Sequence, residues 1–334
     1  MMRKQKPGSE RNAWKPDSVL RWKAENDGQL LECLIGKLKD HKRTAIKAFL
    51  KYGQVAINTM PVSQFDTPVR KGDLLEVNFT RPFVVFSHPR IKLVYEDNDI
   101  IVINKGSGIL SVSTDNIKDG TAYSILRDYL KKKDPRTMLF IVHRLDRDTS
   151  GLMMFAKNVE AKEAMQHNWN NMVLGRKYVA VVEGKVEQEE GTIKSYLAET
   201  SQFEVYSTQN PEEGQLAVTR YKRLKTNNGY SLMELSLDTG RKNQIRVHMK
   251  HIGHPLFNDE RYGGNEILKG THFSKYKQFV ANCFETCPRQ ALHAKTLGFV
   301  HPRTGEQMFF TSELPDDMTL LLEKWRAYIG NREL

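Results

Sequence analysis

After residue 90 the chain consists largely of short runs in which apolar and polar residues alternate, the pattern expected of half-buried strands. The clearest runs are DIIVINK, MLFIV, LMMFAK, KYVAVVEG, VTRYKRL, SLMELSLD and EQMFFTS. Two segments, Met138–Val142 and Leu152–Ala156, are apolar throughout and predict buried strands. Helical spacing is clearest over residues 122–130, 161–169, 243–252 and 318–328. Many strands with few, irregularly placed helices predict an α+β fold with a mixed, largely antiparallel sheet.

The first 90 residues follow a different pattern. Apolar residues recur at helical spacing in QLLECLIGKLKD (29–40) and in KRTAIKAFLKY (42–52), and Gly53 then ends the second helix. QVAIN and VRKGDLLEVNF predict two short strands, with a turn at Lys71–Asp73. We therefore expect the chain to be divided into a disordered basic tail (1–18), a small α/β module (19–80), a linker (81–91) and a large domain (92–334).

Positive charge is concentrated in the N-terminal part. The 334 residues contain 51 Lys and Arg against 40 Asp and Glu, a net charge of +11. Residues 1–90 hold 17 basic and 9 acidic residues, so they account for +8 of that total. Arg43, Lys47 and Lys51 follow at i, i+4 and i+8 and form a stripe on one side of the second helix. Such a stripe is often a solvated face, but the local charge excess favours contact with the phosphates of a polyanion.

The composition of the chain argues against a membrane protein, a disulfide-rich protein and an enzyme with a nucleotide cofactor. No apolar run approaches the ~20 residues that a membrane helix needs, and the N-terminus lacks the apolar core of a signal peptide, so we expect a cytoplasmic protein. Three cysteines argue against a disulfide framework. Cys283 and Cys287 could supply two metal ligands near His293, but without a second ligand pair we expect structural thiols. GxGxxG and GxxxxGK[ST] motifs are absent, so nothing indicates a nucleotide cofactor.

The stretch HRLDRDTSG, from His143 to Gly151, places charged residues between the two most apolar segments. Asp148–Gly151 has the composition of an ordinary turn. A turn does not explain Arg144 and Asp146, which directly follow an apolar run, because buried polar groups are costly unless they are paired. A carboxylate that an arginine keeps ionised can act as a nucleophile or a base.

Two further clusters carry candidate chemistry. In DTGRKNQIRVHMKHIGHP (238–255) a helix is expected over 243–252, with Ile245 and Met249 on its apolar side and Arg246 and Lys250 on another. Taken alone, this cluster is most simply a basic surface helix. GRKYVAVVEG (175–184) leads through Tyr178 into a strand, where a lone tyrosine usually lies in the core or at its rim.

Together these clusters resemble the RluA-type family of pseudouridine synthases. HRLDRDTSGL matches the central signature HRLD-x-x-T-S-G-L over ten residues, and RKYVAVVEG resembles K-x-Y-x-A-x-V-x-G. TGRKNQIRVHM resembles T-G-R-x-H-Q-I-R-x-H with Asn243 in place of the usual His, and INKGSGIL resembles N-K-P-x-G-L with Gly106 in place of Pro. QALHAKTLGFVHPRTGE matches the closing segment, and the two departures lie outside the residues that we expect to be catalytic. HKRTAIKAFLKYGQVAIN and VRKGDLLEV resemble the αL RNA-binding module of ribosomal small-subunit protein four.

The resemblance implies an enzyme that isomerises uridine to pseudouridine within RNA, without cofactor or metal. It assigns the chemistry to Asp146, the pairing with that carboxylate to Arg246 and the stacking on the target base to Tyr178. Arg144 is expected to fill the gap that the extruded base leaves in the helix. We expect phosphate contacts from the basic residues Arg43, Lys47, Lys51, Arg241 and Lys250. The expected partner is ribosomal RNA of the large subunit, with transfer RNA as the second candidate, and the protein is expected to be a monomer.

Two other functions compete with this one. A non-catalytic RNA-binding or ribosome-assembly protein could keep the fold, but the matched Asp146, Tyr178 and Arg246 argue against it. A nucleoside hydrolase or glycosidase would break the same kind of bond, but that class usually needs paired carboxylates or a metal, and no second acid stands in a recognisable motif. Pseudouridine, no change or free uracil as the product distinguishes the three.

Overall fold

The computed structural model describes residues 18–113, 117–227, 229–269 and 273–329, so most of the tail expected over residues 1–18 lies outside the described residues. It divides into two compact units. The first comprises Met1–Ser87 and Arg127–Thr137, and the second comprises His88–Leu126 and Met138–Leu334. None of the helices in the described ranges is both long and apolar enough to cross a bilayer.

The first unit packs two helices on a small sheet. The helices are α1 (Leu30–Lys37) and α2 (Arg43–Lys51), as the apolar spacing predicted. The sheet has the order β1-β6-β3-β4. Its strands, and the separate pair β2 and β5, are β1 (Val19–Lys23), β2 (Gly28–Gln29), β3 (Val55–Ile57), β4 (Met60–Pro61), β5 (Pro68–Val69) and β6 (Leu74–Asn78). The helices bury their apolar sides, Leu30 and Leu34 from α1 and Ile46 and Leu50 from α2.

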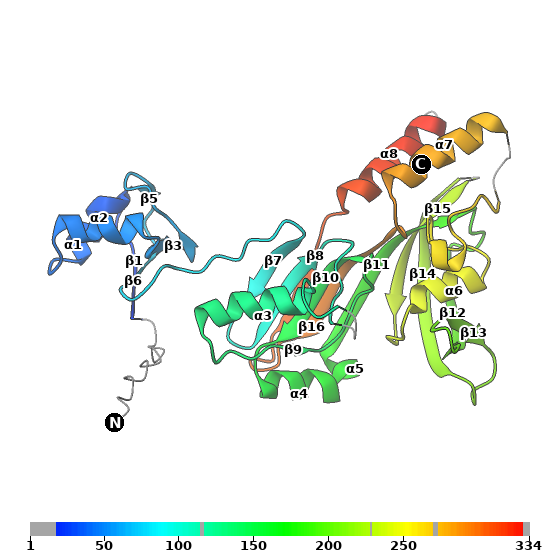
Figure 1. Cartoon of the computed structure of the whole chain (residues 1–334), viewed down its shortest axis with the longest axis horizontal. Helices are drawn as coiled ribbons and strands as arrows, with labels where there is room; N and C mark the ends of the chain where they lie inside the picture. Colours follow the sequence, from blue (N-terminus) through cyan, green and yellow to red (C-terminus); the bar gives the residue numbers. More distant parts are fainter. Residues whose placement is uncertain (1–17, 114–116, 228, 270–272, 330–334) are drawn as a thin grey trace, which may run out of the picture. The chain divides into compact units, whose positions relative to one another are not determined.

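The second unit is built on one long sheet with the order β13-β12-β14-β15-β11-β16-β10-β8-β7, to which β9 and β17 are added (Figure 1). Its strands are β7 (Ile91–Glu96), β8 (Ile100–Lys105), β9 (Phe140–Ile141), β10 (Ser150–Ala156), β11 (Val173–Glu183), β12 (Glu190–Glu199), β13 (Val205–Thr208), β14 (Gln215–Thr226), β15 (Tyr230–Leu237), β16 (Leu292–Val300) and β17 (Gln307–Thr311). Among these strands, β10 and β16 pair in parallel and the other pairs are antiparallel. The prediction of a mixed, largely antiparallel α+β fold is confirmed.

Helices cover this sheet in three places. α4 (Val159–His167) and α5 (Trp169–Met172) pack on β8, β10 and β16. α6 (Gln244–His251) packs its Val247 against the β12–β13 region. α7 (Ser274–Thr286) and α8 (Asp316–Ile329) lie side by side and pack on β11 and β15 (Figure 1). α3 (Ala122–Lys133) lies where the sequence predicted a helix, whereas α7 was not expected.

Two expectations need correction. Leu152–Ala156 lies in the fully buried strand β10, but Met138–Val142 is not a buried strand. In that segment β9 contains only Phe140 and Ile141, and Met138 is 51% exposed. The basic surface helix that the second cluster suggested is also wrong, because α6 buries Gln244, Ile245, Val247, His248 and Met249. Apolar runs show which residues can be buried, but the tertiary fold decides which of them are covered.

Candidate active site

Residues 142–149, here called the signature loop, connect β9 to β10 and carry Asp146 at their centre. The backbone amide of Thr149 donates to the carbonyl of Asp146 at 3.2 Å, which closes a turn. Gly151 then enters β10 with φ +115°, and a Cβ atom at this position would lie 2.3 Å from the carbonyl oxygen of Ala294. Only glycine therefore allows β10 and β16 to approach closely enough to fix the end of the loop.

Three side chains form hydrogen bonds with the backbone of the signature loop. The hydroxyl of Ser111 accepts from the amide of Leu145 and donates to its carbonyl, at 3.0 and 2.6 Å. The fully buried Lys105 donates to the carbonyl of Arg147 at 3.0 Å, and burial lowers the pKa of Lys105 to about 7. Arg289 donates to the carbonyl of Asp148 at 3.0 Å and forms a two-pronged ion pair with Asp317 of α8. These contacts leave the loop little freedom to move.

One carboxylate oxygen of Asp146 accepts hydrogen bonds from neighbouring side chains, and the other has no donor among the described residues. Oδ2 accepts a hydrogen bond from Nδ2 of Asn243 at 2.7 Å and one from Nη1 of Arg246 at 3.4 Å. Among the residues that the structure describes, none donates to Oδ1. The side chain is 23% exposed and faces a cavity. One oxygen is thus oriented by a fixed donor while the other is available to a reacting atom.

Arg246 binds a second carboxylate more closely than it binds Asp146. Its Nε and Nη2 donate to Asp259 at 2.7 and 2.8 Å, and the side chain of Asp259 is only 1% exposed. The guanidinium also lies 4.8 Å from the ring centroid of Tyr262. Asp259 fixes the fork of Arg246 so that the remaining nitrogen points at Asp146. No sequence motif pointed to this role, because Asp259 lies in a polar loop that resembles any other.

Asn243 has a closer relation to Asp146 than the sequence suggested. The departure from the usual His was expected to lie outside the catalytic residues, yet the side-chain amide of Asn243 donates to the Asp146 carboxylate at 2.7 Å. Asn243 has a left-handed backbone (φ 52°) directly before α6, a conformation that asparagine tolerates better than most residues. Its Oδ1 accepts from the hydroxyl of Tyr262 at 3.4 Å, which orients the amide nitrogen toward Asp146.

Asp146 lies between two cavities. The larger, of about 430 Å³, is lined by charged residues that include Arg144, Arg147, Lys242 and Arg261. The smaller, of about 90 Å³, is lined by Arg144, Asp146, Tyr178, Ile245 and Leu292 among others. Arg144 lines both cavities, and no hydrogen bond or ion pair engages its side chain among the described residues. The smaller cavity combines the ring of Tyr178 and a few apolar side chains with the Asp146 carboxylate and four arginines, Arg144, Arg176, Arg241 and Arg246.

Tyr178 forms part of the wall of the smaller cavity from β11. It follows an irregularity in the pairing of β11 with β16, between Lys177 and Tyr178, where the strand locally changes its register. The residue is 6% exposed, and burial raises the pKa of its phenol, with a further small contribution from Asp146. At neutral pH the ring is therefore an uncharged surface that can stack on a base.

The other residues proposed for RNA contact lie in different places. Arg241 lines the smaller cavity and donates to the carbonyl of Leu216 at 3.1 Å. Lys250 lines neither cavity, and its ammonium lies 3.8 Å from the carboxylate of Glu204. Arg43, Lys47 and Lys51 are exposed on α2 of the first unit. Lys242, Arg147 and Arg261 were not among the expected residues, although they line the larger cavity.

Two histidines near the site, the half-buried His143 and the buried His293, are neutral at neutral pH. His143 accepts the amide of Met154 at 3.0 Å, and burial lowers its pKa to about 3. His293 lies between the hydroxyls of Ser150 and Ser312, and burial lowers its pKa to about 4. Both residues anchor the strands around the signature loop, and neither is a suitable base at neutral pH.

The two clustered cysteines lie in the core beneath α7 and α8. Cys283 and Cys287 are both 0% exposed. Burial raises the pKa of Cys283 to about 11 and that of Cys287 to about 12. Both thiols therefore remain protonated at neutral pH and pack as small apolar side chains in the core.

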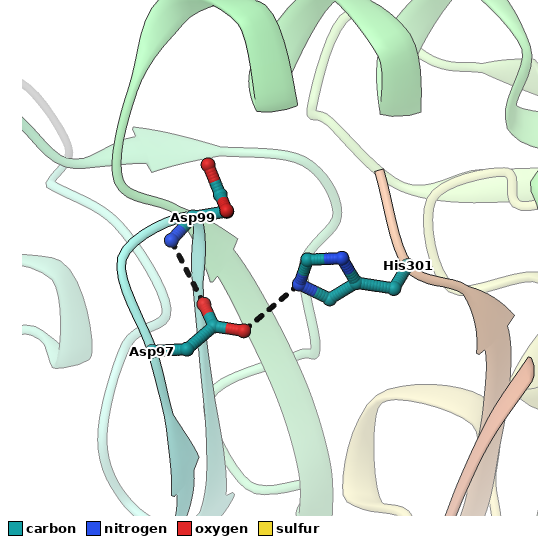
Figure 2. Close-up of side chains that lie close together, drawn as sticks. All are labelled: Asp97, Asp99 and His301. Atoms are coloured by element: carbon teal, nitrogen blue, oxygen red, sulfur yellow. Dashed lines mark hydrogen bonds and ion pairs between the residues drawn. The ribbon is translucent and has the colours of Figure 1, made fainter. Parts of the chain in front are cut away.

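A second charged cluster outside the site consists of Asp97, Asp99 and His301, whose ligand atoms lie within 4.8 Å of one another (Figure 2). Nε2 of His301 lies 2.8 Å from Oδ2 of Asp97, while Oδ1 of Asp97 accepts two backbone amides. The Asp99 carboxylate is bound by the guanidinium of Arg303, which lowers the pKa of Asp99. The carboxylate oxygens of Asp97 and Asp99 already accept hydrogen bonds. The cluster therefore connects the β7–β8 turn to the residues that follow β16.

Comparison with known proteins identifies the family to which this chain belongs. Residues 99–251, which contain the signature loop, Tyr178 and Arg246, match the family model of RNA pseudouridylate synthase. An uncharacterized RNA pseudouridine synthase of Chlorobaculum parvum is 37% identical over 307 residues, which cover 88% of this chain and 93% of that protein. The chain belongs to the RNA pseudouridine synthase family. It is therefore an enzyme of the isomerase class that acts on RNA.

Other members of the family carry more specific names. Ribosomal large subunit pseudouridine synthase D of Haemophilus influenzae is 32% identical, covering 91% of this chain and 93% of that protein. The protein of the same name from Yersinia pestis is 33% identical over 305 residues. Human RNA pseudouridylate synthase domain containing 4 shares the fold, with a TM-score of 0.55 at 21% identity over 70% of this chain. The pseudouridine synthase fold is thus common to this chain and to solved structures.

Proposed function

We propose that this pseudouridine synthase modifies uridine in ribosomal RNA of the large subunit and that Asp146 carries out the chemistry without cofactor or metal. The observation that carries the proposal is the placement of Asp146, which lines two cavities with its Oδ2 held by Asn243 and Arg246 and its Oδ1 without a donor among the described residues. The RNA class is proposed from relatives named as ribosomal large subunit pseudouridine synthases, which align over about nine tenths of this chain. Transfer RNA is the second candidate, and we place the action in the cytoplasm.

The reaction needs no net change of atoms or electrons. The bond between the uracil nitrogen and the ribose breaks, the base turns, and a carbon–carbon bond to carbon five forms before the proton on that carbon is lost. The Asp146 carboxylate would begin the reaction by attack on the ribose or the base, or by removal of a ribose proton. Arg246 and Asn243 would hold the carboxylate ionised and in one orientation through the rearrangement.

The smaller cavity would receive the flipped base. Tyr178 offers an uncharged ring for stacking, and Asp146 lines the same cavity. Extrusion of a base from a stacked helix costs a few kcal/mol, and Arg144 has a guanidinium without a protein partner among the described residues at the mouth of the cavity. Because Arg144 lines both cavities, we assign to it the role of filling the gap that the extruded base leaves in the RNA, which would offset part of that cost.

A glycosidase would need a second working carboxylate. Asp259, Asp148 and Glu260 line the larger cavity with Asp146, so acids are present. Asp259 is buried, and Arg246 engages both of its oxygens. Asp148 lies in a turn beside Arg147, with 3.9 Å between the charged atoms.

Incubation with a large-subunit ribosomal RNA transcript tests the proposal: pseudouridine supports it, free uracil indicates a hydrolase, and no change indicates a non-catalytic binder.

We propose that residues 19–80 form an RNA-binding module of the αL type, joined by the linker 81–91 to the catalytic domain 92–334. The helix–helix–strand order of α1, α2 and β3 supports this proposal, as does the positive charge of the first 90 residues. The exposed cations of α2 would bind phosphates and position the RNA, while the second unit would supply the chemistry.

Replacement of Arg43, Lys47 and Lys51 by Ala should weaken RNA binding and flatten its salt dependence. Three lost phosphate contacts reduce the slope of log K against log salt concentration by roughly 2 to 3 units. Turnover of bound RNA should change little. A titration at several salt concentrations measures the slope. A matched variant with Ala at Lys222, Lys275 and Lys277, which are exposed and line neither cavity, should keep the slope of the wild-type protein. Equal slopes for both variants would contradict the assignment.

Replacement of Asn243 should lower turnover without weakening RNA binding. Asn243→Gly keeps the left-handed backbone accessible and removes the donor to Asp146, so turnover should fall about 10- to 100-fold, the value of one hydrogen bond to a charged group. Asn243→Asp is nearly isosteric, but it places a second negative charge against Asp146 and should lower turnover further. Single-turnover rates at saturating enzyme measure this effect. Wild-type turnover in Asn243→Asp would show that the hydrogen bond plays no part in the reaction.

A further inference from the structure

Phe203 is an aromatic residue in an unusual position. It lies in the turn 200–204 between β12 and β13, and it is 68% exposed. Its backbone is left-handed, with φ at 60°. The other non-glycine residues with positive φ include three asparagines, which tolerate this conformation, whereas a bulky side chain adopts it rarely and at a cost. The position of Phe203 therefore neither buries its ring nor gives its backbone a favourable conformation.

The turn is closed firmly enough to impose that conformation. The amide of Phe203 donates to the carbonyl of Thr200 at 2.9 Å, and the amide of Thr200 donates to the carbonyl of Glu204 at 2.9 Å. The amide of Glu204 donates to the hydroxyl of Thr200 at 3.2 Å. Strained residues that the surrounding structure over-determines tend to cluster at binding and catalytic sites. The turn thus presents a fixed aromatic ring to the solvent.

Two residues connect Phe203 to the larger cavity. Arg261 donates to the carbonyl of Phe203 at 2.5 Å, and the ammonium of Lys242 lies 5.7 Å from the centroid of the phenyl ring. Both Arg261 and Lys242 line the cavity that contains Asp146. Lys242 also pairs with Glu199, so part of its charge is balanced within the protein. The exposed ring therefore stands at the edge of the cavity, beside cations.

We propose that Phe203 is a stacking site for an RNA base next to the target uridine, with Lys242 and Arg261 contacting the adjacent phosphates. An exposed ring beside cations is the combination by which proteins hold single-stranded nucleic acid, and its tolerance of base identity suits a flanking nucleotide. The role would be to grip the strand from which the target base has been extruded. This inference rests on the proposed function, in that the larger cavity must receive RNA.

The test compares Phe203→Asn, which removes the ring and tolerates the left-handed backbone, with Phe203→Trp, which keeps an aromatic ring in the same strained conformation. Phe203→Asn removes the ring and relieves the left-handed conformation, so Tm should stay the same or rise. Affinity for a 12-nucleotide oligoadenylate, which contains no uridine to react, should fall roughly 5- to 100-fold, the effect of one lost stacked base. Phe203→Trp should keep the affinity of the wild-type protein. Phe309→Asn is the control, because Phe309 is also 68% exposed but lines neither cavity.

Each outcome of this test decides the proposal. Unchanged affinity in Phe203→Asn, an equal loss in Phe309→Asn, a loss in Phe203→Trp, or no measurable binding by the wild-type protein would overturn it. Pseudouridine formation by the wild-type enzyme on a large-subunit ribosomal RNA transcript is measured in parallel. A failure there would remove the proposed function, while the affinities for oligoadenylate would still decide whether Phe203 stacks on RNA.

Discussion

Asp146→Asn should form no measurable pseudouridine while it remains folded and bound to RNA. The substitution keeps the size of the side chain and its place in the signature loop, but an amide cannot act as a nucleophile or a base. Loss of a residue that forms or breaks bonds typically costs more than about a thousandfold in turnover. Because the change removes one negative charge from an RNA-facing cavity, affinity should stay the same or increase slightly. A pseudouridine assay and a binding titration on the same preparation measure both effects.

The control for this variant is Asp148→Asn, two residues along the same loop. Asp148 lines the larger cavity, but its backbone carbonyl, not its carboxylate, receives the hydrogen bond from Arg289. Its carboxylate lies 3.9 Å from the guanidinium of Arg147 on a half-exposed surface, where ion pairs contribute little. Asp148→Asn should therefore keep substantial activity. A normal yield of pseudouridine from Asp146→Asn would overturn the mechanism and favour a non-catalytic protein.

Arg246→Ala should lower turnover at least about 100- to 1000-fold, as expected when a fixed charge that supports the reacting group is removed. The same change leaves Asp259 buried without its partner, which costs about 3–5 kcal/mol of folding free energy. Loss of activity in this variant alone would therefore be ambiguous. Arg246→Lys should restore only part of the activity, because an ammonium cannot bind Asp259 with two nitrogens and Asp146 with a third.

A double variant separates chemistry from stability. Arg246→Met with Asp259→Asn removes both charges of the buried pair, so Tm should recover most of the loss seen in Arg246→Ala. Turnover should remain low, since the partner of Asp146 is still missing. Thermal unfolding and single-turnover rates on the three variants test this separation. If the double variant recovers both Tm and full activity, Arg246 serves the fold and not the reaction.

The local sequence pattern predicted the helices and strands whose formation depends mainly on residues close together in the chain. The apolar spacing placed α2 within one residue and α1 within three residues at each end, and the apolar side of α6 contains Ile245 and Met249 as expected. The continuous apolar run Leu152–Ala156 likewise predicted a buried strand, which is β10. Segment 138–142 differed because only Leu139 in it is buried, Met138 and Ile141 are exposed, and β9 pairs with β10 over only two residues.

The supports of Asp146 could not be predicted because they are distant in sequence and ordinary in type. Asn243 is separated from Asp146 by 97 positions, and its contact depends on a left-handed backbone that no local pattern specifies. Asp259 lies in an unremarkable polar loop, and Arg289 is a charged residue that becomes buried only when α8 supplies Asp317. Hydrogen bonds of this kind are decided by the packing of strands and helices, not by their own sequences.

The parallel pairing of β10 with β16 has a consequence for the order in which the protein matures. The signature loop is synthesised early, but the residues that hold its end come much later: Arg289 lies 141 positions after Asp148, and His293 lies 143 after Ser150. Asp317, which fixes Arg289, follows still later in α8. A growing chain that already displays HRLDRDTSG therefore lacks the framework that orients Asp146. If Asp146 carries out the chemistry, as proposed, we expect a copy that ends before Asp317 to carry the motif without the activity.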